Sequence, residues 1–357
     1  MPKSILPREG LTLEALFAPI RQILLQPLLT GSLLLVRYQY LDYIQRWVSP
    51  KAFNNFRSTK ALTALSVLFS IGLLRKINNA LSRLVLNNFT HDDTWDWSKE
   101  VVVVTGGSGG IGALMVQMFA DKNITVIALD ITPPRKPFSC NLFITAPKVH
   151  FYKLDITSTT SIQDVASLIR KSHGDPTVLI NNAGIGTSKT IFDETETEIR
   201  RTFDVNTISH FLLVKEFVPE MVRENHGHIV TVASMASFLV HAGNVDYTCT
   251  KASALAFHEG LGQELKGRYG AGRVRTSIVH PTWIRTPLIE RLTSKPEFKD
   301  FVLEPETVAE AVVEQVLSGY GGQLILPARL GLMSGVRGFP SWLQESMRNG
   351  VNQVLKT

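Results

Sequence analysis

Short apolar runs that alternate with helical stretches are the feature of this chain that most constrains its fold. Seven runs of strand length lie at residues 101–105, 125–129, 150–154, 178–180, 228–233, 275–280 and 323–326. Helical patterns separate several of them, at residues 111–121, 161–171, 196–224 (with a bend near Pro219) and 247–268. Strands alternating with helices predict a parallel sheet covered on both faces. We therefore expect an α/β fold with a doubly wound sheet of about seven strands, which binds ligands at the carboxyl ends of its strands.

A glycine-rich loop follows the first predicted strand and precedes a predicted helix. Gly106, Gly110 and Gly112 permit tight turns and let the backbone approach a pyrophosphate, which a helix N-terminus stabilises. Asp130 ends the second strand, where a carboxylate can accept from the ribose hydroxyls of NAD and repel a 2′-phosphate. Arg135 lies close enough to reach a phosphate. The sequence thus predicts a Rossmann-type dinucleotide site with NAD as cofactor, and NADP stays open as the alternative.

Tyr247 and Lys251 are four residues apart on a predicted helix, so both side chains lie on one face. A phenol beside an ammonium ionises more easily than its usual pKa of about 10 allows. Such a tyrosine can donate and accept a proton. The pair alone is weak evidence for a catalytic site, because both residues are common on helix surfaces. The polar residues that precede it in the sequence strengthen the catalytic interpretation.

Those residues come at the ends of strands, in a fixed order. Asp155 ends the third strand, residues 181–184 (Asn-Asn-Ala-Gly) end the fourth, and Ser234 ends the fifth. Asn206 lies within the long predicted helix that connects the fourth strand to the fifth. Each alone is most often a cap or a turn residue. Together they border the edge of the sheet at which a cofactor is expected.

In this order the motifs resemble the short-chain dehydrogenase/reductase family over about residues 97–330. The resemblance implies that four residues are catalytic: Asn206, Ser234, Tyr247 and Lys251. It implies a cofactor site made of Gly106, Ser108, Gly110, Ile111, Gly112, Asp130, Asp155, Asn182, Ala183, Gly184, Tyr247, Lys251, Ile284 and Thr286. No metal is expected.

The resemblance also implies roles for individual side chains. Tyr247 would be the general acid/base, and Lys251 would bind the nicotinamide ribose and lower the pKa of the tyrosine. Ser234 would hydrogen-bond the substrate oxygen, and Asn206 would hold a water of the proton relay. Thr282 stands where the family more often has glycine, which leaves the local turn open.

Positive charge is concentrated at the N-terminus. Residues 1–90 contain eleven Lys and Arg against three acids and carry +8, whereas the rest of the chain carries −2. The basicity therefore does not belong to the predicted catalytic part, and we expect no nucleic-acid partner. Two apolar runs, at residues 27–36 and 61–74, lie in the same segment, and neither reaches the roughly 20 residues of a single span. Apolar runs flanked by Lys and Arg favour an interfacial or re-entrant membrane anchor. A helical extension packed on its own domain or on a partner is the alternative.

Three regions follow from these patterns. Residues 1–96 are expected to be a membrane-associating segment and linker, 97–330 the catalytic domain, and 331–357 an amphipathic helical tail. Ser341 and Gln344 form a capping-box pattern at the start of the tail helix. The two cysteines, Cys140 and Cys249, lack metal-type spacing, and we expect Cys249 to be a small buried helix residue.

The basic apolar N-terminus and the tail resemble the branch of the family that includes membrane and lipid-droplet retinol and hydroxysteroid dehydrogenases. We therefore expect an NAD(P)-dependent enzyme that interconverts an alcohol and a carbonyl on a retinoid, steroid or long-chain lipid. It would act as a homodimer at the endoplasmic reticulum or lipid droplet, with the catalytic domain facing the cytosol. A carbonyl reductase that tailors a specialised metabolite is one alternative, and a non-catalytic cofactor-binding membrane scaffold is another.

Overall fold

The structure is a computed structural model that describes residues 8–10, 13–138, 148–294, 298 and 300–351. The chain forms two compact units, residues 1–85 and 86–357. Cys140 lies outside the described residues. Cys249 is exposed, which corrects the expectation of a buried residue. Its neighbours Thr248, Thr250 and Lys251 are buried, so position 249 falls on the outer face of its helix.

The second unit is built on a seven-stranded parallel sheet in the order β3-β2-β1-β4-β5-β6-β7. Its strands are β1 (Val101–Thr105), β2 (Thr125–Asp130), β3 (Val149–Lys153), β4 (Val178–Asn181), β5 (His228–Val232), β6 (Arg275–Pro281) and β7 (Gly322–Leu326). The doubly wound α/β fold is therefore confirmed. From β1 the chain first builds outward to β3 and then returns to place β4 on the other side of β1. That reversal makes the carboxyl ends of β1 and β4 the expected ligand crevice.

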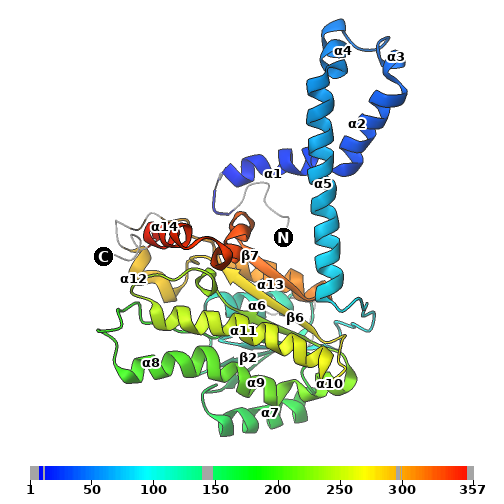
Figure 1. The fold of residues 1–357 in the computed structure, drawn as a ribbon. Helices are drawn as coiled ribbons and strands as arrows, with labels where there is room; N and C mark the ends of the chain where they lie inside the picture. Colours follow the sequence, from blue (N-terminus) through cyan, green and yellow to red (C-terminus); the bar gives the residue numbers. More distant parts are fainter. Residues whose placement is uncertain (1–7, 11–12, 139–147, 295–297, 299, 352–357) are drawn as a thin grey trace. The chain divides into compact units, whose positions relative to one another are not determined.

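The strands are continuous apolar runs because helices cover both faces of the sheet (Figure 1). Val102 and Val104 of β1 pack with α6 (Gly110–Ala120) and α13 (Pro305–Leu317). Val101 and Val103 face the opposite layer. That layer comprises α7 (Thr159–His173), α9 (Ser209–Phe217) and α11 (Val245–Gly267).

The predicted helix at residues 196–224 is interrupted. It consists of α8 (Glu196–Phe203), a π-helical turn η1 (Asp204–Ile208), α9 and α10 (Pro219–Glu224). A capping box between Thr195 and Glu198 opens α8. The π turn inserts one residue and turns Asn206 inward, where it is fully buried.

The C-terminal tail forms the 3₁₀ segment η4 (Ala328–Gly338) and the helix α14 (Ser341–Val351). The predicted capping box is wrong in its geometry. Ser341 is already helical, and Gln344 Nε2 donates to the carbonyls of Phe339 (2.8 Å) and Arg337 (3.2 Å). The glutamine therefore ties the helix to the segment that precedes it.

Residues 87–96, predicted as part of a linker, belong to the second unit and pack against the rest of it. Asn87 Nδ2 donates to the Gly321 carbonyl (3.2 Å), and the buried Arg275 donates to the carbonyls of Asn87 (3.0 Å) and Thr90 (3.1 Å). His226 contacts the Asp92 carboxylate at 3.1 Å. These contacts fix the start of the second unit beside β6 and β7.

In the N-terminal unit, the described residues form helices joined by turns: α1 (Leu13–Leu24), α2 (Pro27–Gln39), α3 (Leu41–Ile44), α4 (Pro50–Arg57) and α5 (Thr59–Leu86). The sequence suggested no comfortable span, yet α5 has 28 residues, because the helix continues past Arg75. Among the described helices it is the one long and apolar enough to cross a bilayer, by length and composition. Glycines allow close packing within this unit, since a Cβ on Gly72 would lie 2.4 Å from the Leu25 carbonyl oxygen.

Candidate active site

The glycine-rich loop after β1 adopts a backbone that requires glycine. Gly106 and Gly110 have φ of +65° and +52°. A Cβ on Gly112 would lie 2.0 Å from the Gly106 carbonyl oxygen. Gly109 caps α6 without a side-chain hydrogen bond, so the first amides of this helix are directed at the loop. The loop and the helix N-terminus thus form a cradle suited to a pyrophosphate.

The end of β4 holds this loop in place. Thr105 Oγ1 accepts from the amides of Asn182 (3.0 Å) and Ala183 (3.1 Å), and Asn182 Nδ2 donates to the Thr105 carbonyl (2.9 Å). The two strands at the switch point are therefore tied together where the ligand crevice opens. Asn182 supports the loop and also reaches the cavity wall.

Two carboxylates stand at the next strand ends. Asp130 Oδ2 accepts from the Ser108 amide (3.1 Å), and its Oδ1 accepts from the Thr132 amide (3.2 Å). Asp155 Oδ1 accepts from the Thr157 amide (3.0 Å). Both carboxylates are oriented by backbone donors and line one cavity.

That cavity, of about 550 Å³, brings together five of the predicted cofactor residues: Gly106, Asp130, Asp155, Ala183 and Gly184. Arg200, Arg201 and Asp204 also line it, and no sequence pattern singled them out. A neighbouring cavity of about 590 Å³ joins Ser108, Gly110 and Asp130 to Arg135 and Lys136. Gly112 lines neither cavity, because it packs under Gly106.

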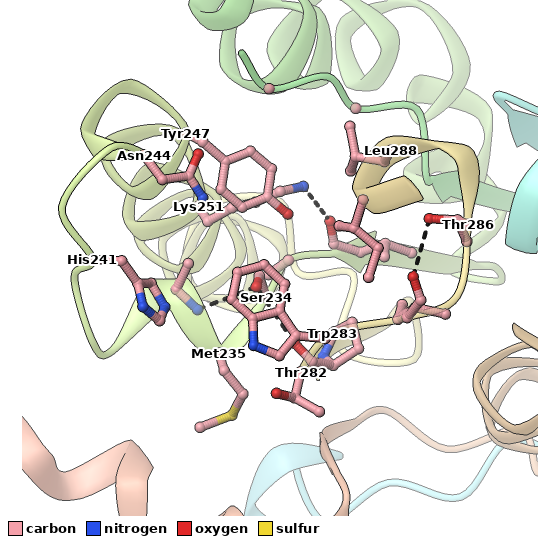
Figure 2. A pocket seen from close by; sticks show the side chains of 18 of the residues that line it. Ser234, Met235, His241, Asn244, Tyr247, Lys251, Thr282, Trp283, Thr286 and Leu288 are labelled. Atoms are coloured by element: carbon pink, nitrogen blue, oxygen red, sulfur yellow. Dashed lines mark hydrogen bonds between the residues drawn. The ribbon is translucent and has the colours of Figure 1, made fainter. Parts of the chain in front are cut away.

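A third cavity, of about 320 Å³, contains the predicted reacting groups (Figure 2). It brings together Ile111, Asn182, Gly184, Ser234, Tyr247, Lys251, Ile284 and Thr286. Gly184 also lines the cavity of the two carboxylates, so the two spaces meet at this residue. A single extended ligand can therefore run from Asp130 to Tyr247.

Ser234 and Tyr247 come from opposite ends of one connection. Ser234 follows β5 and caps the short helix η2 (Met235–Ser237), where its Oγ accepts from the Ala236 amide (3.2 Å). Tyr247 lies in the first turn of α11, and a Cβ on Gly186 would lie 3.2 Å from its ring. Burial raises the pKa of Tyr247 to about 12, and hydrogen bonding with Ser234 opposes this rise.

The pKa of Tyr247 is therefore raised and not lowered as expected, because burial is the largest effect on it. Burial also acts on its neighbour Lys251. Burial lowers the pKa of Lys251 to about 8. Its Nζ donates to the Val232 carbonyl (2.9 Å) and lies 5.4 Å from the Tyr247 ring centroid. The ammonium is thus held at the cavity by a strand carbonyl.

Asn206 lies behind the cavity wall. Its Oδ1 accepts from the Ile185 amide (2.9 Å), and its Nδ2 donates to the Ile185 carbonyl (2.8 Å) and to Thr250 Oγ1 (3.1 Å). The side chain therefore fixes the β4 loop to α11 at Thr250, the residue before Lys251. Its π turn is the local feature that makes this possible.

Several cavity residues had no signal in the sequence. His241, Asn244, Trp283 and Asp300 line it, as do Leu330, Met333 and Val351 of the C-terminal segment. For the tail, the sequence predicted only an amphipathic helix and no contact with the reacting cavity. Thr282 needs no glycine-like backbone: its φ is not positive, and its amide donates to the Leu326 carbonyl (2.9 Å).

Known proteins share this sequence and fold. A family model described as short chain dehydrogenase matches residues 100–297. Dehydrogenase RED2 of Cochliobolus heterostrophus is 44% identical over 233 residues, which cover 65% of this chain and 85% of that protein. Estradiol 17-beta-dehydrogenase 11 of Rattus norvegicus is 30% identical, with 71% of this chain and 84% of that protein covered. Epidermal retinol dehydrogenase 2 of Homo sapiens is 32% identical, with 61% and 71% covered.

Among solved structures, the ligand-free aldohexose dehydrogenase of Thermoplasma acidophilum superposes with a TM-score of 0.55 at 25% identity. The match covers 65% of this chain and 93% of that one. The sheet order, the glycine cradle and these matches have one explanation: the chain belongs to the short-chain dehydrogenase/reductase family and is an NAD(P)-dependent oxidoreductase.

Proposed function

We propose that the enzyme interconverts an alcohol and a carbonyl on an apolar substrate, with Tyr247 as general acid/base. The observation that supports this most is the composition of the reacting cavity. Ser234, Tyr247 and Lys251 share one wall of it. The rest of the lining is largely apolar and includes Met235, Leu239, Leu288, Ile289, Leu330, Met333 and Val351.

The residues present fit a nicotinamide dinucleotide. The cradle at Gly106 and Gly112 admits no Cβ, and the buried Ser108 hydroxyl has no hydrogen-bond partner among the described residues. Asp130 and Asp155 would hold the adenosine half, and Ile284 and Thr286 would border the nicotinamide. The bound cofactor would supply or accept the hydride. The protein must then exchange a proton with the substrate oxygen and stabilise the charge that develops on it.

In carbonyl reduction, Tyr247 would protonate the substrate oxygen, and Ser234 would donate a hydrogen bond to it as charge develops. Lys251 would hold positive charge beside the phenol. Asn206 would keep the β4 loop and α11 at a fixed spacing. In alcohol oxidation the same groups would act in reverse, with Tyr247 accepting the proton.

The pH dependence of reduction should follow Lys251. Its ammonium form is present below its pKa of about 8 and is lost as the pH rises through that value. We therefore expect kcat/KM for carbonyl reduction to fall above pH 8, approaching a tenfold loss per pH unit. A profile measured from pH 6 to 10 checks this. Lys251→Arg, whose side chain stays charged, should remove the break. A wild-type profile that stays flat through pH 9.5 would contradict the role of Lys251.

We propose NAD as the preferred cofactor, because the Asp130 carboxylate faces the site expected for the ribose. Asp130→Asn removes the charge and keeps an oxygen that can accept from the Ser108 amide. Since a like-charge contact costs several kcal/mol, this variant should raise the ratio of NADPH to NADH kcat/KM by at least about 10-fold. Arg135 and Lys136 on the adjacent cavity would then meet the 2′-phosphate. An unchanged ratio would argue against Asp130 as the selector.

The proposed substrate class is a retinoid, a steroid or a long-chain lipid. The apolar cavity supports it, as do relatives named for estradiol and retinol. The test is a panel of retinoid, steroid, long-chain and small polar alcohols and carbonyls, assayed in detergent with both cofactors. Turnover restricted to the small polar compounds would refute the proposal. Such an enzyme would serve lipid metabolism.

We further propose that residues 1–96 hold the enzyme on a membrane or lipid-droplet surface, with residues 97–330 as the catalytic domain in the cytosol and 331–357 as a tail. Ile71 and Leu74 of α5 are 48% and 66% exposed. The unit also carries a net charge of +8 over residues 1–90. We also propose a homodimer, for which the exposed Ile208 and Phe211 offer apolar surface.

The membrane proposal predicts the effect of charged substitutions in α5. A charged residue within an inserted helix costs about 2.5–3.5 kcal/mol. The double variant Ile71→Asp, Leu74→Asp should therefore move the full-length protein from the membrane pellet to the supernatant. Phe192→Asp is the matched control, because Phe192 is 99% exposed on the catalytic unit and should leave the protein in the pellet. Wild-type protein in the supernatant after low-salt fractionation would refute the anchor.

A further inference from the structure

One buried polar atom on the wall of the reacting cavity has no hydrogen-bond partner. His241 is 9% exposed, and its Nδ1 is buried without a partner among the described residues. A buried polar group left without a hydrogen-bond partner destabilises the folded chain. Of the side-chain atoms in this condition in the described part of the chain, it is the one whose residue lines this cavity. A bound ligand is the natural partner for it.

The residues around His241 contact its ring but give its Nδ1 no hydrogen bond. The ring lies 5.6 Å from that of Trp283, whose Nε1 donates to Asp300 Oδ2 (3.0 Å). Burial lowers the pKa of His241, and the charge of Asp300 opposes this. The imidazole is therefore neutral near pH 7, with one donor and one acceptor nitrogen. Such a group recognises a hydroxyl or a carbonyl.

This polar position is distinct from the reacting one. Figure 2 shows the His241 ring apart from the Tyr247 phenol, on the loop that precedes α11. Met235 and Leu239, which also line the cavity, are apolar. A substrate that reacts at Ser234 and Tyr247 therefore meets apolar side chains together with a few polar ones, such as Asn244 and Asp300. Among the polar residues of this lining, His241 is the one with a buried side-chain atom that lacks a partner in the described part of the chain.

We propose that His241 binds a second oxygen function of the substrate. The preferred substrate is then an apolar molecule that carries a hydroxyl or carbonyl besides the one that reacts. This inference rests on the proposed alcohol–carbonyl chemistry and narrows its substrate class. A neutral imidazole at this position makes the contact selective for an uncharged oxygen group.

The test uses apolar ketones, each paired with versions that carry one added hydroxyl or carbonyl at successive positions along the same skeleton. Wild-type enzyme should favour at least one bifunctional member by about 10-fold in kcat/KM over its simple ketone. His241→Phe should abolish that preference, because it lowers kcat/KM for the bifunctional ketone by about 10-fold more than for the simple ketone. His241→Asn, which restores a donor and an acceptor, should recover part of the preference. Cys249→Ser is the control, because this exposed side chain lies on the outer face of α11, away from the cavity.

Two results would overturn the inference. One is a wild-type enzyme with no preference for any bifunctional member. The other is an equal loss for simple and bifunctional ketones in His241→Phe. Binding of the same compounds to cofactor-loaded Tyr247→Phe, by calorimetry with and without His241→Phe, separates this inference from the proposed function. If binding depends on His241 but the wild type shows no turnover, the proposed alcohol–carbonyl conversion is refuted. The inference that His241 binds an oxygen group of the ligand is then retained.

Discussion

Replacing Tyr247 by phenylalanine is expected to lower kcat/KM by about 10²–10⁴-fold, the usual contribution of a positioned general acid/base. The phenyl ring keeps the packing against Gly186, so the cavity should keep its shape. The hydroxyl that would exchange the proton with the substrate oxygen is lost. Steady-state kinetics measure the first effect. Titration with NADH should show an affinity within about twofold of wild type, because the lost atom makes no contact with the glycine cradle.

The neighbouring residue offers a matched control for this variant. Cys249 lies two positions further along α11 and is exposed, so Cys249→Ser should leave kcat/KM unchanged. Full activity in Tyr247→Phe would contradict the role of Tyr247 as general acid/base. Loss of NADH binding in the same variant would show that the substitution had disturbed the site as a whole.

Gly112→Ala is expected to damage both stability and cofactor binding. The added methyl would lie 2.0 Å from the Gly106 carbonyl oxygen and 2.8 Å from Asn182 Nδ2. Neither neighbour can move freely, because Asn182 is bonded to Thr105. Overpacking of this kind costs about 1–3 kcal/mol of unfolding free energy. Because the loop that faces the pyrophosphate must shift, NADH affinity should fall by at least about 10-fold, or about 1.4 kcal/mol.

Calorimetric unfolding and cofactor titration check this prediction. Gly260→Ala on α11 is the control: its Cβ would meet nothing within 4 Å, and alanine favours a helix by about 1 kcal/mol. We therefore expect Gly112→Ala to lower both the unfolding free energy and the NADH affinity. Gly260→Ala should leave the stability unchanged or raise it. Unchanged NADH affinity in Gly112→Ala would contradict the assignment of this loop to the cofactor.

Much of the sheet could be predicted because its strands are apolar runs buried on both faces. Val101–Thr105 and Val178–Asn181 lie within one residue of their predicted bounds. The glycines and the strand-end polar residues could also be predicted to gather at one edge, because parallel strands all end there. The topology thus turned residues far apart in sequence into the walls of two cavities.

The rest depended on interactions that leave no local pattern. The π turn around Asn206 is stabilised by Ile185 and Thr250, from a loop and a helix distant in sequence. His241 reaches the cavity because the connection between η2 and α11 folds over it, which no spacing rule predicts. The pKa of Tyr247 also depends on burial in the folded cavity, which raises it, whereas the sequence shows only the nearby lysine. Burial lowers the pKa of Lys251 in the same way.

An isotope-labelling experiment tests most directly whether this site transfers hydride from the cofactor to a carbonyl carbon. Wild-type enzyme is supplied with a ketone substrate from the panel and with reduced cofactor that carries deuterium at both C4 positions of the nicotinamide. We predict an alcohol with deuterium at the former carbonyl carbon, formed by the wild type and about 10²–10⁴-fold more slowly by Tyr247→Phe. Alcohol formed without deuterium at that carbon, or formed equally well by the variant, would contradict the proposal that this site transfers hydride with Tyr247 as its proton donor.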